Sequence, residues 1–218
     1  MSPMTERIPR RSPTAGERQR DPERTKAKIL EAAIAEFGAK GFAATRVSDI
    51  AERAGVNKQL ISYYFGGKEG LYAELTRMWQ QVSDDYSRAE QPLDAVVGNF
   101  VLSNVHYRDW ARLMVWSNLD TGSGPPGQDD DREYLLGQVA DLRRRQEAGE
   151  LPDDLDPAYL MIALFAAAAA GVTLPRVVRM VCGVDPASEE FATTYAEQLA
   201  RLVRHLHPAA EPLGSKGK

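Results

Sequence analysis

The feature that most restricts the fold is a pair of short helical patterns joined by a Gly-Val turn. The first pattern runs over residues 46–54 and the second over residues 57–64, each with apolar residues on one face. Gly55 permits the sharp turn, Thr45 is the expected N-cap of the first helix, and Asn57 is the expected N-cap of the second. Two short helices joined by such a turn form a helix-turn-helix.

The second of these helices carries the residues suited to reading DNA. In a helix-turn-helix the second helix lies in the major groove, with its N-terminal residues toward the base edges. Lysine can donate to guanine, glutamine can bind adenine through two hydrogen bonds, and serine or tyrosine hydroxyls can bind phosphate. The residues expected to stay exposed there are Lys58, Gln59, Ser62 and Tyr63. Lys68 is expected to hold a phosphate by its charge, together with the amides at the start of the next helix.

Helical spacing of apolar residues continues through the rest of the chain, and no segment shows convincing strand alternation. The expected fold is all-α: an N-terminal three-helix DNA-binding domain with the helix-turn-helix, followed by a larger helical domain for ligand binding and dimerisation. The predicted segments are a disordered basic arm over residues 1–20, the DNA-binding domain over 21–67, the helical domain over 68–207 and a disordered tail over 208–218. The arm is either solvated or touches phosphate or the minor groove.

Capping residues and loop-forming segments predict the helix boundaries. The first helix is expected to open at Asp21-Pro22 and to close at Gly41. The fourth helix is expected to start at Lys68, and the last follows Asp185-Pro186. Between them, helices are expected over residues 93–106, 109–119, 130–148 and 157–181, the last of these with a kink at Pro175.

The distribution of charge separates the two ends of the 218-residue chain. Residues 1–80 hold 14 Lys and Arg against 10 Asp and Glu, whereas residues 81–218 hold 13 against 21, although the net charge is only −4. A basic N-terminal module beside an acidic body suits local contact with phosphate. The single cysteine, Cys182, fits a reducing compartment. The apolar run 158–172 is shorter than the roughly 20 residues of a spanning helix, so we expect a buried helix in a cytoplasmic protein with neither membrane anchor nor secretory signal.

Two quoted stretches resemble the tetracycline-repressor (TetR) family of bacterial regulators. They are RVSDIAERAGVNKQLISYYFGGKEGLY, from Arg46 to Tyr72, and KAKILEAAIAEFGAKGF, from Lys26 to Phe42. The resemblance covers roughly residues 22–75 and implies a C-terminal body that is all-helical, ligand-binding and dimeric.

The resemblance also implies which side chains contact DNA. By position, base and backbone contacts fall on Lys58, Gln59, Tyr63 and Tyr64, and phosphate contacts fall on Lys68 and on either Thr45 or Arg46. Ser62 stands where the family usually has tyrosine, and Gly66-Gly67 replace a more usual polar pair. Alternatively, Tyr63 and Tyr64 pack in the core.

One recognition helix reads only a few base pairs, so we expect two copies on a palindromic operator and a two-fold interface in the body. The small residues around Ala167, within 166–171, would allow close approach of two backbones. The apolar stripe of the last helix offers a surface for a second copy: Phe191, Tyr195, Leu199 and Leu202. Alternatively, the stripe packs only within one chain.

The middle helices carry an aromatic-rich set that could line a pocket for a small hydrophobic or aromatic effector. The candidate contacts are Trp79, Phe100, Asn104, Tyr107, Trp110 and Trp116. Aromatic residues at helical spacing also serve as ordinary core, so each has that alternative.

Nothing in the sequence indicates catalysis. No set of nucleophile, base and orienting residue is visible, and neither the histidines nor Cys182 stand at metal-ligand spacing, so we expect no enzyme activity, cofactor or metal. The leading hypothesis is a ligand-responsive repressor that binds its operator as a homodimer and is released by a small molecule. The alternatives are a regulator of the same fold without a small-molecule ligand, either protein-controlled or an activator, and a helical enzyme or adaptor.

Overall fold

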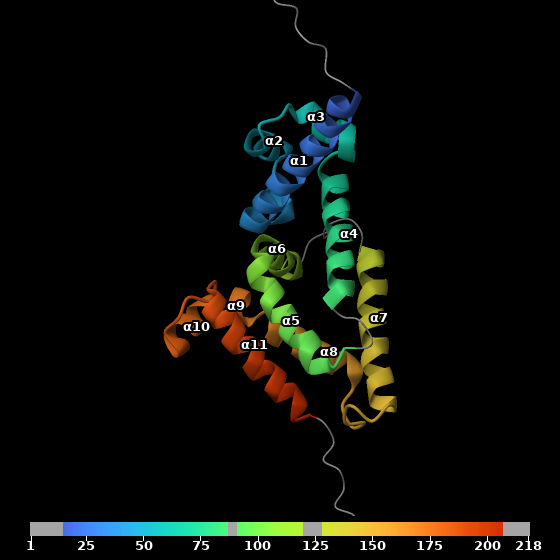
Figure 1. Cartoon of the computed structure of the whole chain (residues 1–218), viewed down its shortest axis with the longest axis vertical. Coiled ribbons are helices and arrows are strands. Elements are labelled where there is room, and N and C mark those ends of the chain that lie inside the picture. The colour runs from blue at the N-terminus through green and yellow to red at the C-terminus, as the bar shows by residue number, and fades with distance from the viewer. Residues whose placement is uncertain (1–14, 87–90, 120–127, 207–218) are drawn as a thin grey trace, which may run out of the picture.

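The computed structural model describes residues 15–86, 91–119 and 128–206, and the regular elements within these ranges are all helices (Figure 1). This confirms the all-α prediction. Residues 1–14 and 207–218 lie outside the described part of the chain, so most of the expected arm and all of the expected tail fall there. The helices are α1 (Ala15–Ala44), α2 (Val47–Ala54), α3 (Lys58–Phe65), α4 (Lys68–Tyr86), α5 (Leu93–His106), α6 (Arg108–Leu119), α7 (Gln128–Glu147), α8 (Pro157–Ala168), α9 (Ala170–Thr173), α10 (Pro175–Cys182) and α11 (Glu189–Arg204).

Helix α1 begins earlier than its capping pattern predicts. It starts at Ala15, and Pro22 lies inside it. A proline inside a helix removes one backbone hydrogen bond, and here the helix continues through that loss. At the other end, Gly41 has a φ of 77°, outside the helical region, so the helix is interrupted where the sequence predicts its end.

The turn of the helix-turn-helix forms as the sequence predicts, with one exception. Gly55 is left-handed, with φ 65° and ψ 37°, and the amide of Val56 donates to the carbonyl of Ala51 at 3.0 Å. The side chain of Asn57 caps α3 by accepting from the amide of Gln59 at 2.9 Å. The prediction that Thr45 caps α2 is wrong, because Arg46 occupies the N-cap position and makes no capping bond through its side chain.

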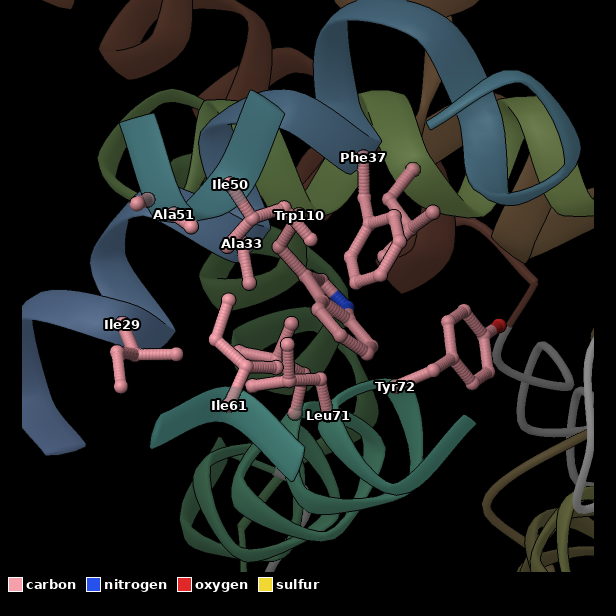
Figure 2. Packing of buried hydrophobic residues seen from close by; sticks show 12 residues of the cluster. Ile29, Ala33, Phe37, Ile50, Ala51, Ile61, Leu71, Tyr72 and Trp110 are labelled. Carbon is pink, nitrogen blue, oxygen red and sulfur yellow. The ribbon is translucent and has the colours of Figure 1, made fainter. Parts of the chain in front are cut away.

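A single core holds α1 to α4 together, and α6 completes it (Figure 2). Ile50 from α2 and Ile61 from α3 point into it, and Phe37 of α1 packs edge-on against Tyr72 of α4. Trp110 of α6 is buried in the same cluster. The core of the N-terminal domain therefore contains a residue from the part of the chain assigned to the body.

The body has its own core between α5 and α11. Val97 and Val101 of α5 pack with Leu199 and Val203 of α11, and Ala168 of α8 closes the cluster. A smaller cluster joins α7 and α8. Together with α6, these helices form the lower half of the molecule in Figure 1.

The apolar segment 157–181 is not one kinked helix. Leu174 leaves the helical region, with φ −123° and ψ 42°, because the residue before a proline disfavours the helical conformation, and Pro175 opens the new helix α10. The expectation of a buried helix is also wrong, because Tyr159 and Ile162 of α8 are 75% and 60% exposed. No helix within the described ranges combines the length and apolarity needed to cross a bilayer.

Candidate nucleic-acid interface

Helix α3 presents a polar edge to solvent. Lys58, Gln59 and Ser62 are exposed, and Tyr63 is 79% exposed. Ile61 is fully buried in the N-terminal core on the opposite side of the helix. The helical period of 3.6 residues explains this division, because one apolar residue per turn faces α1 and α2 while its neighbours turn away.

A buried carboxylate fixes α2, and with it α3, on α1. Arg53 donates from Nε to Oε1 of Glu36 at 2.7 Å, and Nζ of Lys40 lies 2.7 Å from Oε2 of Glu36. Lys40 also donates to Asp49 at the start of α2 at 2.9 Å. Hydrogen bonding from Lys40 and then Arg53 lowers the pKa of Glu36, against the effect of its burial.

This cluster is absent from the residues predicted from the sequence. The spacing of Glu36 and Lys40 on one helix was a detectable signal. The pairing of Glu36 with Arg53, 17 residues away, depends on how α2 packs, so no sequence pattern predicts it.

Two predicted phosphate contacts have internal partners. Thr45 is 2% exposed, and its hydroxyl donates to the carbonyl oxygen of Gly41 at 2.8 Å, so of the pair Thr45 and Arg46 only Arg46 has an exposed side chain. Lys68 donates to the carbonyl oxygen of Thr45 at 3.0 Å, and its Nζ lies 4.4 Å from the ring centroid of Phe42. Lys68 thus holds the segment before α2, and these hydrogen bonds leave fewer of its ammonium N–H donors for a phosphate.

Tyr64 differs from its neighbour. It is half-buried against the N-terminal core, and its ring lies 5.0 Å from that of Tyr63 and below the ammonium of Lys26. The core-packing interpretation fits Tyr64, whereas Tyr63 fits the interpretation as a DNA contact.

The structure does not bring the six predicted ligand contacts together. Trp79 stacks on the buried Trp110, with ring centroids 5.3 Å apart, and Tyr107 meets Trp79 edge-on. These three join α4, α6 and the residue between α5 and α6 in one aromatic contact. Phe100 packs with the α5–α11 core. Trp116 lies beside Gly41, close enough that a Cβ atom there would be 3.4 Å from it.

Asn104 of that set lines a cavity of about 280 Å³ between α5, α6, α9 and α10. Its amide nitrogen also donates to the carbonyl oxygen of Ala168 at 2.8 Å.

Most of the apolar stripe predicted to meet a second copy is covered within the chain. Phe191 and Leu199 are buried inside the chain, and Tyr195 stacks on Phe191 while its hydroxyl donates to the carbonyl oxygen of Ala167 at 2.9 Å. These residues therefore pack within one chain, contrary to the expectation that they meet a second copy. Leu202 is 58% exposed and stays available.

Helices α2 and α3, joined by a tight turn and displaying a polar edge, define a helix-turn-helix protein with a helical C-terminal body. Residues 29–75 match the model of bacterial regulatory proteins of the tetR family, and residues 93–204 match that of the tetracyclin repressor-like C-terminal domain. The chain belongs to the TetR family and is a DNA-binding, non-enzymatic transcriptional regulator.

Individual relatives match over most of their length. The HTH-type transcriptional repressor SCO4008 of Streptomyces coelicolor is 30% identical over 84% of this chain and 97% of its own. The HTH-type transcriptional regulator RutR of Escherichia coli K12 is 27% identical over 87% of this chain and 93% of its own. The crystal structure of the transcriptional regulator SCO4942 from Streptomyces coelicolor superposes with a TM-score of 0.68 at 25% identity, covering 85% of this chain and 99% of that one.

Proposed function

We propose that this protein is a transcriptional repressor that binds a palindromic operator as a homodimer and leaves it when a small molecule binds the helical body. The observation that carries the proposal is the outward polar edge of α3, held rigidly by its cap and by the core behind it. The name of the relative SCO4008 as a transcriptional repressor supports the sign of the regulation.

The position of each side chain on α3 suggests its role. Lys58 and Gln59 occupy the first turn of the helix, which is the end that points toward base edges in a helix-turn-helix. Ser62 and Tyr63 lie one turn later and suit the sugar-phosphate backbone or a thymine methyl group. A bidentate contact from Gln59 to adenine contributes about 1–3 kcal/mol of discrimination against a wrong base.

The surface that supports a homodimer lies on α8. Tyr159, Ile162 and Phe165 are spaced three residues apart and are all exposed, so they form one apolar face of the helix. Leu135 and Leu136 of α7 are also exposed and, with Ile162, line an apolar groove of about 380 Å³. A contiguous apolar face of this kind suits an interface with a second copy.

Helix α6 suits the transmission of a ligand signal to the DNA-binding helices. In Figure 1 it lies between α1 and the body, and a side chain at Gly38 of α1 would lie 2.5 Å from the carbonyl oxygen of Asp109 on α6. Trp110 of the same helix is part of the N-terminal core. Because the packing is this close, α6 cannot shift without moving α1, which changes the spacing of the two reading helices in a dimer.

Binding of the full-length protein to DNA tests this proposal. A labelled palindromic fragment from the region upstream of the protein's own gene is titrated and followed by anisotropy at several salt concentrations. We expect two chains per fragment, an affinity that falls steeply with salt, and weaker binding when one half-site is scrambled. A protein that ignores duplex DNA even at low ionic strength would contradict the proposal.

A reporter under the same promoter tests the sign of regulation. Expression is expected to rise when the protein is deleted and to fall when it is restored. The variant Lys58→Ala is expected to lose repression, whereas Gln198→Ala, an exposed position on α11, is expected to keep it. Lower expression on deletion would identify an activator instead.

A further inference from the structure

The cavity of about 280 Å³ in the body is lined by arginines from two helices. Arg108 and Arg112 come from α6, and Arg179 comes from α10 on the other side. Arg108 and Arg112 are four residues apart and so lie on the same face of α6, one turn from each other. Three exposed arginines thus line one small cavity.

The charge of this cavity is opposite to that of its surroundings. Residues 81–218 hold 13 Lys and Arg against 21 Asp and Glu, yet no acidic residue is among the described residues that line the cavity. Neither Arg108 nor Arg112 makes an ion pair within the described part of the chain. Arg179 has Asp185 as a partner at 3.8 Å, and both of these side chains are more than half exposed. The lining residues therefore carry positive charge, which favours an anion in the cavity.

The rest of the lining is apolar or neutral. Val105 and Val172 contribute aliphatic surface, Pro175 and Pro186 contribute rings, and the amide of Asn104 adds one polar group. A pocket with apolar walls and a few convergent polar groups is the usual form of a small-molecule site. The volume of about 280 Å³ lies just below the ~300–1,000 Å³ of such sites, which favours a small ligand.

We infer that this cavity binds a small organic anion, with its carboxylate or phosphate between Arg108, Arg112 and Arg179 and its apolar part against the valines and prolines. Guanidinium groups match the planar carboxylate and the phosphate with paired hydrogen bonds. The inference rests on the proposed release of DNA by a small molecule and names the chemical class of that molecule. It also adds an anionic group to the hydrophobic or aromatic effector expected from the sequence.

The position of the arginines connects this site to the DNA-binding helices. Arg108 and Arg112 flank Asp109, whose backbone is the part of α6 that lies closest to Gly38 of α1. An anion that draws Arg179 of α10 toward α6 would shift α6, and with it the close contact between Asp109 and Gly38 of α1. Ligand binding and DNA affinity are therefore coupled through one helix.

Thermal unfolding and DNA binding of the full-length protein test the inference. The probes are benzoate and phenyl phosphate at millimolar concentration, with benzamide and benzyl alcohol as uncharged matches and sodium chloride at equal ionic strength as the salt control. At least one of the two anions is expected to raise the Tm by about 3 °C or more and to weaken operator binding beyond the salt control. The two anions together show whether a carboxylate or a phosphate is preferred.

The arginine variants locate the effect. Arg108→Gln/Arg112→Gln and Arg179→Gln are expected to bind the anion at least about tenfold more weakly and to keep their DNA binding in its absence. Arg143→Gln, an exposed arginine of α7 outside the cavity, is expected to respond like the wild type.

Three results would overturn the inference: no shift with either anion, an equal shift with the uncharged match, or an unchanged response in the arginine variants. The failure of the proposed function is a separate result, because it appears as a lack of operator binding before any probe is added.

Discussion

The N-terminal helices and the body each bury an apolar core, but they differ in what their exposed helix faces carry. In the N-terminal core, Ile29, Phe37 and Ile61 are fully buried, and the edge that faces solvent on α3 is polar. In the body, large apolar side chains such as Tyr159 and Ile162 remain exposed on α8. The difference fits the two partners proposed above: charged, hydrated DNA for the N-terminal helices and an apolar surface of a second copy for the body.

The two regions meet through α6, which belongs to both. Its Trp110 completes the N-terminal core, while its Arg108 and Arg112 line a cavity of the body. The contrast between the regions can therefore be tested by changes that act on one region and spare the other.

The largest expected effect comes from emptying the N-terminal core. Phe37→Ala removes a fully buried ring that packs against Phe42 and Tyr72, and it is expected to lower the free energy of unfolding by about 3–5 kcal/mol. Denaturant titration measures the loss, and anisotropy shows whether operator binding disappears with it. A body variant, Val101→Ala, is expected to cost less. Equal losses of DNA binding in both variants would contradict the separation of the two regions.

The second-largest effect is expected at the proposed dimer interface on α8. Ile162→Glu places a charge in the exposed face of α8 and is expected to raise the dimer Kd by about 100-fold or more, because burial of that side chain contributes about 1.5–3 kcal/mol and the charge must be desolvated. Sedimentation equilibrium measures the change. Val181→Glu on α10 is the matched control in a second exposed apolar position, and it is expected to leave the dimer intact. The opposite pattern would place the interface on α10.

A smaller effect tests the connection through α6. Gly38→Ala puts a carbon 2.5 Å from the carbonyl oxygen of Asp109, so α1 and α6 must separate, at about 1–3 kcal/mol. Gly137→Ala on α7 meets nothing within 4 Å and is expected to stabilise the protein by about 0.5–1 kcal/mol. Thermal unfolding of both variants measures the contrast. Loss of the response to an effector in Gly38→Ala alone would sharpen the role of α6.

The smallest effect is a dependence on pH. The pKa of Glu36 is lowered in the folded state, so its contribution to stability is present above its ordinary pKa of 4.5 and disappears as the pH falls through the folded value. Glu36→Gln is expected to be less stable than the wild type by about 1 kcal/mol at pH 7. The difference between the two proteins is expected to shrink below about pH 4.5. A difference that stays constant across this range would show that Glu36 acts through shape and not through charge.

Local patterns in the sequence predicted the turn between α2 and α3 and the N-cap of α3, but not the start of α1 or the N-cap of α2. Gly55 and Asn57 are adjacent to the elements that they end and begin, so their effect can be recognised without knowledge of the tertiary structure. The same holds for the outward position of Lys58 and Gln59, because helical periodicity alone decides it once Ile61 is buried. The DNA contacts of these side chains stay predictions.

Features that depend on packing between distant segments were not predictable. Phe191 and Leu199 form an apolar stripe, but the sequence does not say whether α5 or a second chain covers it. A hydroxyl at position 45 suits a helix cap, yet the Thr45 hydroxyl donates its hydrogen bond to the carbonyl oxygen of Gly41. The cavity arginines of α6 and α10 are more than 60 residues apart along the chain.

The most direct test of the central claim is a comparison of Gln59→Ala with the wild type on a set of operators, each with one base pair changed in both half-sites. If α3 reads base edges, the variant loses discrimination of about 1–3 kcal/mol at one position of each half-site and binds the other substitutions as the wild type does. A uniform loss at every sequence, or no change at any, would contradict the assignment of α3 as the reading helix.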